Sequence, residues 1–338
     1  MQLVITTYGT YLNKVGDCFH LKSQEKEHKF SARKISSIVV GNAISITTDA
    51  VELAIDNNID IVFLDKFGNP YGRIWHPKLG STTLIRRYQL EWGSQEKGFE
   101  LAKEWVLTKC DNQVEFLRDL QKARPKKKEM LEKFIAQIVP LQTEIKNMSG
   151  TLTEKRLCIM GLEGSISRIY FKSLADLMPP RYKFEGRSRQ PAKDGFNCLL
   201  NYAYGILYGQ VEKACIIAGL DPYAGFLHTD NYNKPALVFD LIEMFRHLAD
   251  RAAVYLFSRR LVTEDIFDKV RGGLSLNEKG KQLLITHFNQ RLDKKVCYRK
   301  RQIKQSNIIQ LECHRIAQHI LKTAKNELRL GENDEIKF

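Results

Sequence analysis

The 338-residue sequence contains no hydrophobic run that approaches the roughly 18 to 20 residues needed to span a bilayer. Its first residues, MQLVITTYG, lack the charged region, apolar stretch and small-residue cleavage site of an export signal. The seven cysteines are scattered and none forms a CxxC pair, which argues against a disulfide framework and a structural zinc site. Internal repeats and low-complexity tracts are also missing. We therefore expect a reduced, folded protein of the cytoplasm.

Positive charge is what the sequence has in excess. The 53 Lys and Arg residues against 39 Asp and Glu give a formal net charge of +14. Such a surface attracts polyanions and releases their counterions, although charge alone fits a merely basic protein equally well. The distribution adds weight, because residues 271–304 contain ten Lys and Arg but only two acids, and a second basic cluster occupies 181–193. These two clusters predict a nucleic-acid-binding surface.

The hydrophobic pattern changes its period near residue 84. Before that point, short runs rich in β-branched and aromatic residues predict strands: LVITTYG, CFHLK, ISSIVVG, IDIVFLD and YGRIW. One helix interrupts them, with caps at Thr48 and Asp49. Helical periodicity follows over 84–122, 127–148, 152–177, 195–218, 236–260 and 307–328. The expected fold class is α+β: a small N-terminal β-rich domain with one helix (1–83) and a larger all-α domain (84–338).

Glu163 is the first candidate for chemistry. It lies at the edge of the apolar stripe of the helix predicted over 152–177, between Gly161 and Gly164. A carboxylate beside buried surface is costly unless it is paired or binds a metal, and the glycines would let a ligand approach closely. For Glu163 taken alone, a rim glutamate paired with an arginine such as Arg168 is the favoured alternative.

His228 and two further acids lie close together in the sequence. His228 stands in the loop GFLHTD, and a lone histidine is more often structural than a ligand. The helix predicted to follow it, ALVFDLIEMFR, places Asp240 and Glu243 together opposite its apolar face, with His247 on the same side. Taken alone, this helix has an ordinary solvated polar face.

A divalent cation would offset the repulsion between these acids. Like charges three residues apart repel, and no Lys or Arg stands four residues after either Asp240 or Glu243. Carboxylates with one imidazole suit Mg²⁺ or Mn²⁺. Such an ion can polarise a phosphodiester and activate an attacking hydroxyl, which is chemistry that a DNA-seeking protein would need.

Several motifs, in order, resemble the CRISPR-associated integrases, the universal adaptation endonucleases of those immune systems. The spacing of Glu163, the GFLH loop and the DLIEMFR helix is similar to that family's catalytic site, and FEGRSRQPAKDGFN followed by NYAY resembles its Arg–Pro–Asp–Asn–Tyr signature. GGLSLNEKGKQLL and the β-rich segment from VITTYGTYLNK to FGNPYGRI fit as well. Two departures are Ser165-Ile166-Ser167, where small residues with an alanine are common, and His247, where a proline is common.

The resemblance implies a site, a reaction and partners. Glu163, His228 and Glu243 would hold Mg²⁺ or Mn²⁺, with Asp240 as a nearby auxiliary acid of the catalytic site. A 3′-hydroxyl of a short DNA fragment would attack a phosphodiester at a CRISPR repeat, in antiviral defence in the prokaryotic cytoplasm. The implied partners are DNA, a second copy joined through the β domain, and a small ferredoxin-like Cas protein. Contacts with the DNA backbone are expected from Arg187, Arg189, Lys294, Lys295, Arg299 and Arg301.

Two other functions fit the same residues. With water as the nucleophile, the site would make a metal-dependent nuclease of branched or single-stranded DNA. A DNA-bending scaffold would use only the positive charge, its acids would form a solvated face, and it would show no metal dependence. His247 is also close enough to the two acids on the helix to rival His228.

Overall fold

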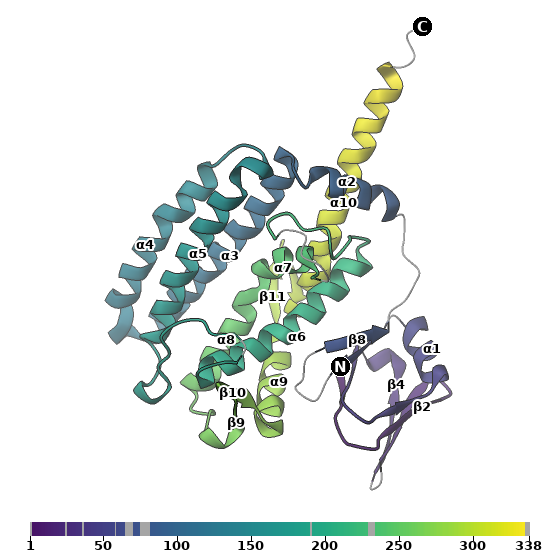
Figure 1. Ribbon diagram of the computed structural model, residues 1–338. Helices are drawn as coiled ribbons and strands as arrows, with labels where there is room; N and C mark the ends of the chain where they lie inside the picture. Colours follow the sequence, from purple (N-terminus) through teal and green to yellow (C-terminus); the bar gives the residue numbers. More distant parts are fainter. Residues whose placement is uncertain are drawn as a thin grey trace. The chain divides into compact units, whose positions relative to one another are not determined.

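The computed structural model describes residues 2–23, 26–35, 37–57, 59–64, 70–74, 82–189, 191–228 and 234–334 (Figure 1). The chain divides into two compact units, Met1–Gly80 and Ser81–Phe338, and each has its own hydrophobic core. Every helix within these ranges is too short or too polar to cross a membrane.

Two four-stranded sheets form the first unit. Its strands are β1 (Gln2–Ile5), β2 (Tyr11–Val15), β3 (Cys18–Lys22), β4 (Glu27–Ser31), β5 (Ser37–Val40), β6 (Ser45–Ile46), β7 (Asp60–Leu64) and β8 (Pro70–Ile74). One sheet has the order β1-β5-β7-β8, with β1, β5 and β7 parallel and β8 antiparallel to β7. The other has the order β4-β3-β2-β6. Alternate side chains of β5, Ile38 and Val40, are buried, as the two-residue period of a strand requires.

The helix of the first unit is α1 (Thr48–Asp56). Its N-cap is Thr47, whose hydroxyl accepts a hydrogen bond from the backbone of Ala50 at 3.3 Å. The buried residues Ala50 and Leu53 lie on the face that packs against β2 and β7. The predicted helix is thus present, and its cap is one residue earlier than the sequence suggested.

Helices dominate the second unit. They are α2 (Thr82–Trp92), α3 (Glu96–Ala123), α4 (Lys128–Asn147), α5 (Leu152–Ala175), α6 (Gly195–Ile217), α7 (Ala236–Ile242), α8 (Arg246–Ser258), α9 (Glu278–Leu292) and α10 (Gln305–Asp334). The long helices α3, α4 and α5 lie side by side (Figure 1). Helix α6 packs against α7, α8, α9 and α10. A single 3₁₀ turn, Glu243–Phe245, separates α7 from α8.

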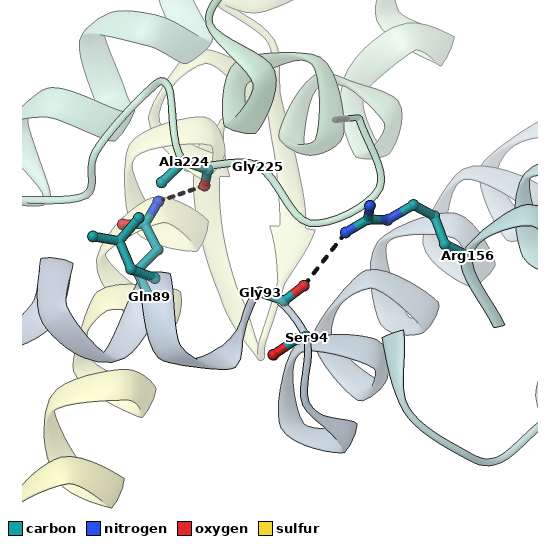
Figure 2. A pocket seen from close by; sticks show the side chains of 7 residues that line it. Gln89, Gly93, Ser94, Arg156, Ala224 and Gly225 are labelled. Carbon is teal, nitrogen blue, oxygen red and sulfur yellow. Dashed lines mark hydrogen bonds between the residues drawn. The ribbon is translucent and has the colours of Figure 1, made fainter. Parts of the chain in front are cut away.

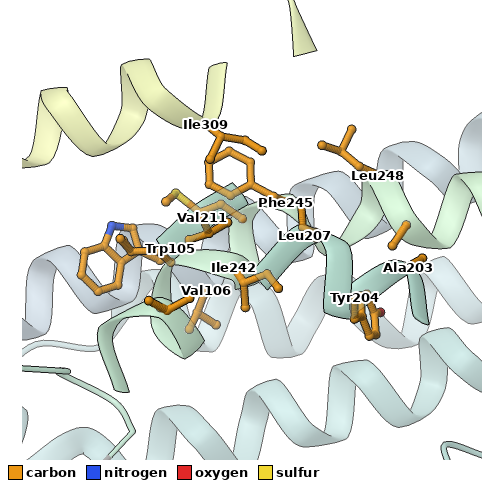
Figure 3. Close-up of a cluster of buried hydrophobic side chains, with 14 of the residues drawn as sticks. Trp105, Val106, Ala203, Tyr204, Leu207, Val211, Ile242, Phe245, Leu248 and Ile309 are labelled. Atoms are coloured by element: carbon orange, nitrogen blue, oxygen red, sulfur yellow. The ribbon is translucent and has the colours of Figure 1, made fainter. Parts of the chain in front are cut away.

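Buried apolar side chains from distant parts of the sequence join these helices (Figure 3). Trp105 and Val106 of α3 meet Leu207 and Val211 of α6, together with Ile242, the last residue of α7. All five side chains are at most 1% exposed, so each contributes roughly 1.5 to 3 kcal/mol of burial energy. Lys109, one turn further along α3, and Glu243, the residue that follows Ile242, are therefore fixed in position.

Two short hairpins interrupt the helices. The first pairs β9 (Phe267–Val270) with β10 (Gly273–Leu276), and the second pairs β11 (Lys295–Tyr298) with β12 (Arg301–Lys304). In the second hairpin Tyr298 pairs with Arg301, so the turn consists of Arg299 and Lys300. Both of these residues have positive φ angles, 48° and 65°.

The fold class α+β, predicted from the sequence, is confirmed. Each predicted strand run contains a strand, and β2, β4 and β6 were not predicted. The helix predicted over 84–122 is two helices, because the chain turns at 93–95 between α2 and α3. The two hairpins and α9 are further elements that the predicted all-α domain did not include. The second unit begins at Ser81, three residues before the predicted boundary.

Candidate functional site

Glu163 and Glu243, two of the predicted metal ligands, meet at the ammonium group of Lys109. Lys109 Nζ lies 2.5 Å from Glu243 Oε2 and donates a hydrogen bond to Glu163 Oε1. Ser167 Oγ also donates to Glu163 Oε1, at 2.7 Å. The Lys109 side chain is 8% exposed and that of Glu163 is 25% exposed, so water screens this cluster poorly. The structure thus gives Glu163 a lysine from another helix as its cation, where the sequence suggested Arg168.

Glu243 is buried and has a second cationic neighbour. Arg246, three residues later, donates from Nε to Glu243 Oε1 at 2.8 Å. Burial alone would raise the pKa of Glu243, but the charges of Arg246 and Lys109 lower it to about 2. These two cations offset the repulsion that the sequence suggested a metal would relieve. Glu243 Oε2 is close to the Lys109 ammonium, yet it has no aligned hydrogen bond among the described residues.

Asp240 is fully buried and binds the loop that carries His228. Its Oδ2 accepts hydrogen bonds from the backbone N–H groups of Phe226 at 2.6 Å and Leu227 at 3.0 Å. Its Oδ1 is 3.0 Å from the backbone nitrogen of His228 and 2.6 Å from the imidazole Nδ1. Both carboxylate oxygens are therefore used. Asp240 thus fixes the orientation of the His228 ring through Nδ1, and its role as an auxiliary acid stays a prediction.

The two histidines differ in their surroundings. Burial opposes protonation of His228, but the hydrogen bond and the charge of Asp240 raise its pKa above the ordinary value, and Glu243 acts in the same direction. Burial and the charge of Arg251 lower the pKa of His247 to about 3. Neither Glu163 nor Glu243 is among the groups that shift His247. His228 is therefore the better candidate to act with the two glutamates.

The donor atoms at this site suit a divalent cation. Within the described ranges, no three acids, histidines or cysteines are already gathered around a metal position. One ammonium instead stands between Glu163 and Glu243. The carboxylates of Glu163 and Glu243 and the imidazole Nε2 of His228 are nevertheless ligand types that Mg²⁺ and Mn²⁺ accept, and Glu243 Oε2 has no aligned hydrogen bond among the described residues. The roles of Glu163, His228 and Glu243 as metal ligands and catalytic residues stay predictions.

A buried carboxylate belongs to a hydrogen-bond network next to the site. Asp250 of α8 accepts hydrogen bonds from the hydroxyls of Tyr204 at 2.6 Å and Tyr170 at 3.0 Å. Burial raises the pKa of Asp250, although both hydrogen bonds act to lower it. The guanidinium of Arg246 lies 4.7 Å from the centre of the Tyr204 ring. This network connects Arg246, and through it Glu243, to α5 and α6.

Replacing Tyr204 by phenylalanine is expected to lower the free energy of unfolding by about 1 to 3 kcal/mol, because one oxygen of the buried Asp250 loses its donor. Urea denaturation measures the change. Tyr182→Phe is the matched control, since the Tyr182 hydroxyl donates at 3.0 Å to a backbone carbonyl at a half-buried position and should cost about 1 kcal/mol or less. Equal losses in the two variants would contradict a special role for the Asp250 network.

Arg187, one of the predicted DNA contacts, is engaged within the fold. It donates to Asn197 Oδ1 and, at 2.8 Å, to Asn201 Oδ1. Its guanidinium also lies 5.4 Å from the centres of the Phe171 and Tyr204 rings. The signature arginine and asparagines thus hold the loop against α6. A DNA contact by Arg187 stays a prediction.

The predicted DNA contacts beyond Arg187 are exposed. They are Arg189, Lys294, Lys295, Arg299 and Arg301. The last three belong to the β11–β12 hairpin, where Arg299 also forms a 3.3 Å ion pair with Glu312. The hairpin therefore presents a basic edge to solvent, and its contact with DNA stays a prediction.

A small polar pocket borders the loop that leads to His228 (Figure 2). Gln89 Nε2 donates to the carbonyl of Ala224 at 2.7 Å, which fixes the start of the loop. Arg156 of α5 donates to the carbonyl of Gly93 at 3.4 Å from the other side (Figure 2). Gln89 thus anchors the loop to α2, and Arg156 joins the α2–α3 turn to the helix that carries Glu163.

Lys109 and Arg246 are the site residues that the sequence analysis missed. A signal for Lys109 was present, because it stands among Val106, Cys110 and Gln113, which α3 buries on one face. A charged residue at an apolar position of a helix indicates a buried partner. Which partner it meets depends on helix packing, which periodicity does not report.

The fold and this site define a two-unit α+β protein with paired carboxylates and an oriented imidazole in its helical unit. A family model described as CRISPR associated protein Cas1 matches residues 3–290. A CRISPR-associated endonuclease Cas1 of Archaeoglobus fulgidus is 34% identical over 324 residues, with 92% of this chain and 94% of the relative covered. A CRISPR-associated protein Cas1 of Methanobrevibacter ruminantium is 31% identical, over 82% of this chain and 84% of the relative. The chain belongs to the Cas1 family.

Solved structures agree with the fold. A Cas1 protein from Thermotoga maritima has a TM-score of 0.80 at 23% identity, with 95% of this chain and 97% of that chain covered. A casposase bound to integration product also has a TM-score of 0.80 at 23% identity, with 95% and 91% covered. The architecture of both units is therefore that of known proteins.

Proposed function

We propose that this chain is a metal-dependent DNA integrase that inserts short DNA fragments into a CRISPR repeat array. The observation that carries the proposal is the convergence of Glu163 and Glu243 on one buried cation beside the oriented His228, in a chain of the Cas1 family. The name of the Archaeoglobus relative, an endonuclease, supports action on nucleic acid. The net charge of +14 supports a polyanionic substrate.

The side chains divide the work as follows. Glu163, His228 and Glu243 would hold Mg²⁺ or Mn²⁺, which when bound neutralises charge on the phosphodiester and activates an attacking hydroxyl. Asp240 orients the His228 ring through Nδ1. Arg246 keeps Glu243 ionised. Phosphoryl transfer depends mainly on position and charge, and the residues that the structure fixes would supply both.

The attacking group is tested by following both products. A labelled DNA fragment and a supercoiled plasmid with a repeat are incubated with the protein, its proposed partner, and Mn²⁺, Mg²⁺ or EDTA. We expect label joined to plasmid with either metal and none in EDTA. Cleaved but unjoined DNA would indicate the alternative nuclease, with water as nucleophile. Joining in EDTA would contradict metal dependence.

The basic edge of the β11–β12 hairpin is expected to bind DNA backbone. Lys294, Lys295 and Arg301 are replaced by Ala, whereas Arg299 is kept because it also pairs with Glu312. The triple variant should bind duplex and branched DNA more weakly and flatten the salt dependence by roughly one unit of slope per lost contact. Fluorescence anisotropy at several salt concentrations measures both quantities.

The matched control replaces 126–128, three exposed lysines at the α3–α4 turn, by alanine. This variant removes the same charge from a site with no assigned function, so its salt slope should stay near that of the wild type. If the two variants lose equal affinity, binding follows total charge and the hairpin has no specific part. If the hairpin variant keeps the DNA affinity and salt slope of the wild type, the hairpin does not bind DNA, and the loop 181–193 becomes the candidate contact.

The proposal includes partners and a cellular place. The β-rich unit would join two copies of the chain, and a small ferredoxin-like Cas protein would bridge two such dimers. All would act in the prokaryotic cytoplasm, where the repeat array lies. The dimer is tested by light scattering, which compares the molar mass of the isolated wild-type protein with that of a variant whose edge strands in the β-rich unit are altered.

A further inference from the structure

Lys109 is a buried charge at the centre of the site. It is 7% exposed and lies midway along α3. Lysine is almost never buried unless it is paired, and here the pair consists of Glu163 and Glu243. A lysine that contacts two carboxylates is an ammonium at neutral pH.

The oxygens that Lys109 contacts belong to the acids proposed to bind a metal. It contacts Glu163 Oε1 and Glu243 Oε2. A divalent ion held by both acids would compete for the same two side chains. Two cations crowded onto these carboxylates would repel strongly, because screening is weak in a poorly hydrated site. Occupation by the ammonium and by a metal is therefore mutually unfavourable.

The charge balance of the metal-free site indicates that Lys109 takes the place of a metal there. Lys109 and Arg246 carry two positive charges, and Glu163 and Glu243 carry two negative ones. The cluster is neutral as it stands. Without Lys109, two carboxylates would face each other with only Arg246 to balance them, and of these two acids Arg246 forms an ion pair only with Glu243. Lys109 is therefore what allows the acids to approach each other before a metal arrives.

We propose that Lys109 is a placeholder cation that gathers Glu163 and Glu243 in the metal-free protein and has to be displaced by the metal. The inference rests on the proposed function. Lys109 is then a positioning residue that acts through the two acids. Lys109 lowers the affinity of the site for the metal, but it keeps the two acids close together before the metal binds. It also favours divalent ions, since a monovalent ion offers the acids no more charge than the ammonium does.

The test replaces Lys109 by methionine, which has a similar length, no charge and a high helix propensity. Calorimetric titration should show Mn²⁺ affinity raised at least about tenfold, since a competing unit charge has left a poorly screened site. In EDTA the melting temperature should fall below that of the wild type, because the two carboxylates now repel. Saturating Mn²⁺ should raise the melting temperature more in the variant than in the wild type. A merely structural lysine would not produce a tighter metal site.

Two controls separate charge from size and position. Lys109→Arg keeps the charge and should bind Mn²⁺ no more tightly than the wild type. Lys103→Met removes a lysine from the same helix, one that pairs with Glu100 at 2.6 Å, and should leave Mn²⁺ affinity unchanged. If Lys109→Met does not fold, Lys109→Gln gives the same comparison, since its amide is neutral and can still donate to one carboxylate.

The outcomes distinguish this inference from the proposed function. Unchanged or weaker Mn²⁺ binding in the neutral variants, with normal binding by the wild type, overturns the placeholder and leaves the integrase standing. An equal gain in Lys103→Met also overturns it. Absence of Mn²⁺ binding in the wild type and in both neutral variants, together with metal-independent joining of DNA, overturns the proposed function itself.

Discussion

Strand transfer by a Glu163→Ala variant is expected to be at least about a hundredfold slower than that of the wild type, the scale of losing one electrostatic stabiliser. Glu163 would contribute a metal ligand, and alanine contributes none. The fold should survive, because Lys109 keeps Glu243 as a partner at 2.5 Å and no buried charge is left unpaired. The measurement is incorporation of a labelled fragment into a supercoiled plasmid that carries a repeat, with Mn²⁺ and the partner protein present.

The control for Glu163→Ala is Glu115→Ala, which removes an exposed carboxylate from α3. It should leave strand transfer unchanged. Glu243→Ala is expected to slow strand transfer as Glu163→Ala does and to destabilise the fold as well, because the partly buried Arg246 loses its carboxylate partner. DNA affinity should stay the same or rise in both variants, since a negative charge has left the site. Wild-type activity in Glu163→Ala would exclude its catalytic assignment and favour a DNA-bending scaffold, whose acids need no metal.

Asp240→Ala is expected to lower the free energy of unfolding by about 3 kcal/mol or more. Three backbone N–H groups, of Phe226, Leu227 and His228, would lose their acceptor in a buried place, and each such loss costs about 1 to 3 kcal/mol. The His228 ring would also lose the contact that orients it. Urea denaturation measures the first effect, and Mn²⁺ titration measures the second as weaker binding.

Asp221→Ala is the matched control because Asp221 lies at the other end of the same loop. Its carboxylate accepts one backbone hydrogen bond, from Tyr223 at 2.9 Å, so its loss should cost about 1 kcal/mol. A small effect of Asp240→Ala on stability, with a large one on strand transfer alone, would show that Asp240 acts directly on the reaction, as an auxiliary acid would.

The sequence predicted the fold wherever one local pattern decides the structure. Runs such as IDIVFLD become strands because β-branched side chains alternate there, and β7 forms over most of that run. Strands β2 and β4 were not predicted because YLNKV and EHKFS mix charged and apolar residues, and their pairing with β3 decides their structure. The turn between α2 and α3 was missed because one glycine and one serine interrupt a continuous apolar period.

The candidate site was predictable only in part, for a related reason. Helical spacing brought out Glu163, and the acids after the GFLH loop were visible together. The same spacing placed Asp240 on a solvated face, whereas the structure buries it completely. Burial depends on which neighbouring segments cover a helix face. Periodicity therefore cannot distinguish a solvent-exposed polar face from one whose side chains bind a loop. The burial of Lys109 left a signal in the sequence, but its pairing with Glu163 could not be predicted, because the two residues lie 54 positions apart on different helices.

The turn of the β11–β12 hairpin has a backbone conformation that its two residues do not favour. Two-residue hairpin turns with positive φ at both positions favour Asn-Gly, yet this one is Arg299-Lys300, at 48° and 65°. Side chains with a Cβ in this region cost about 1 to 2 kcal/mol each. A turn of Asn-Gly would therefore be more stable here. Arg299 and Lys300 instead place two positive charges at the tip of the hairpin at a cost in stability.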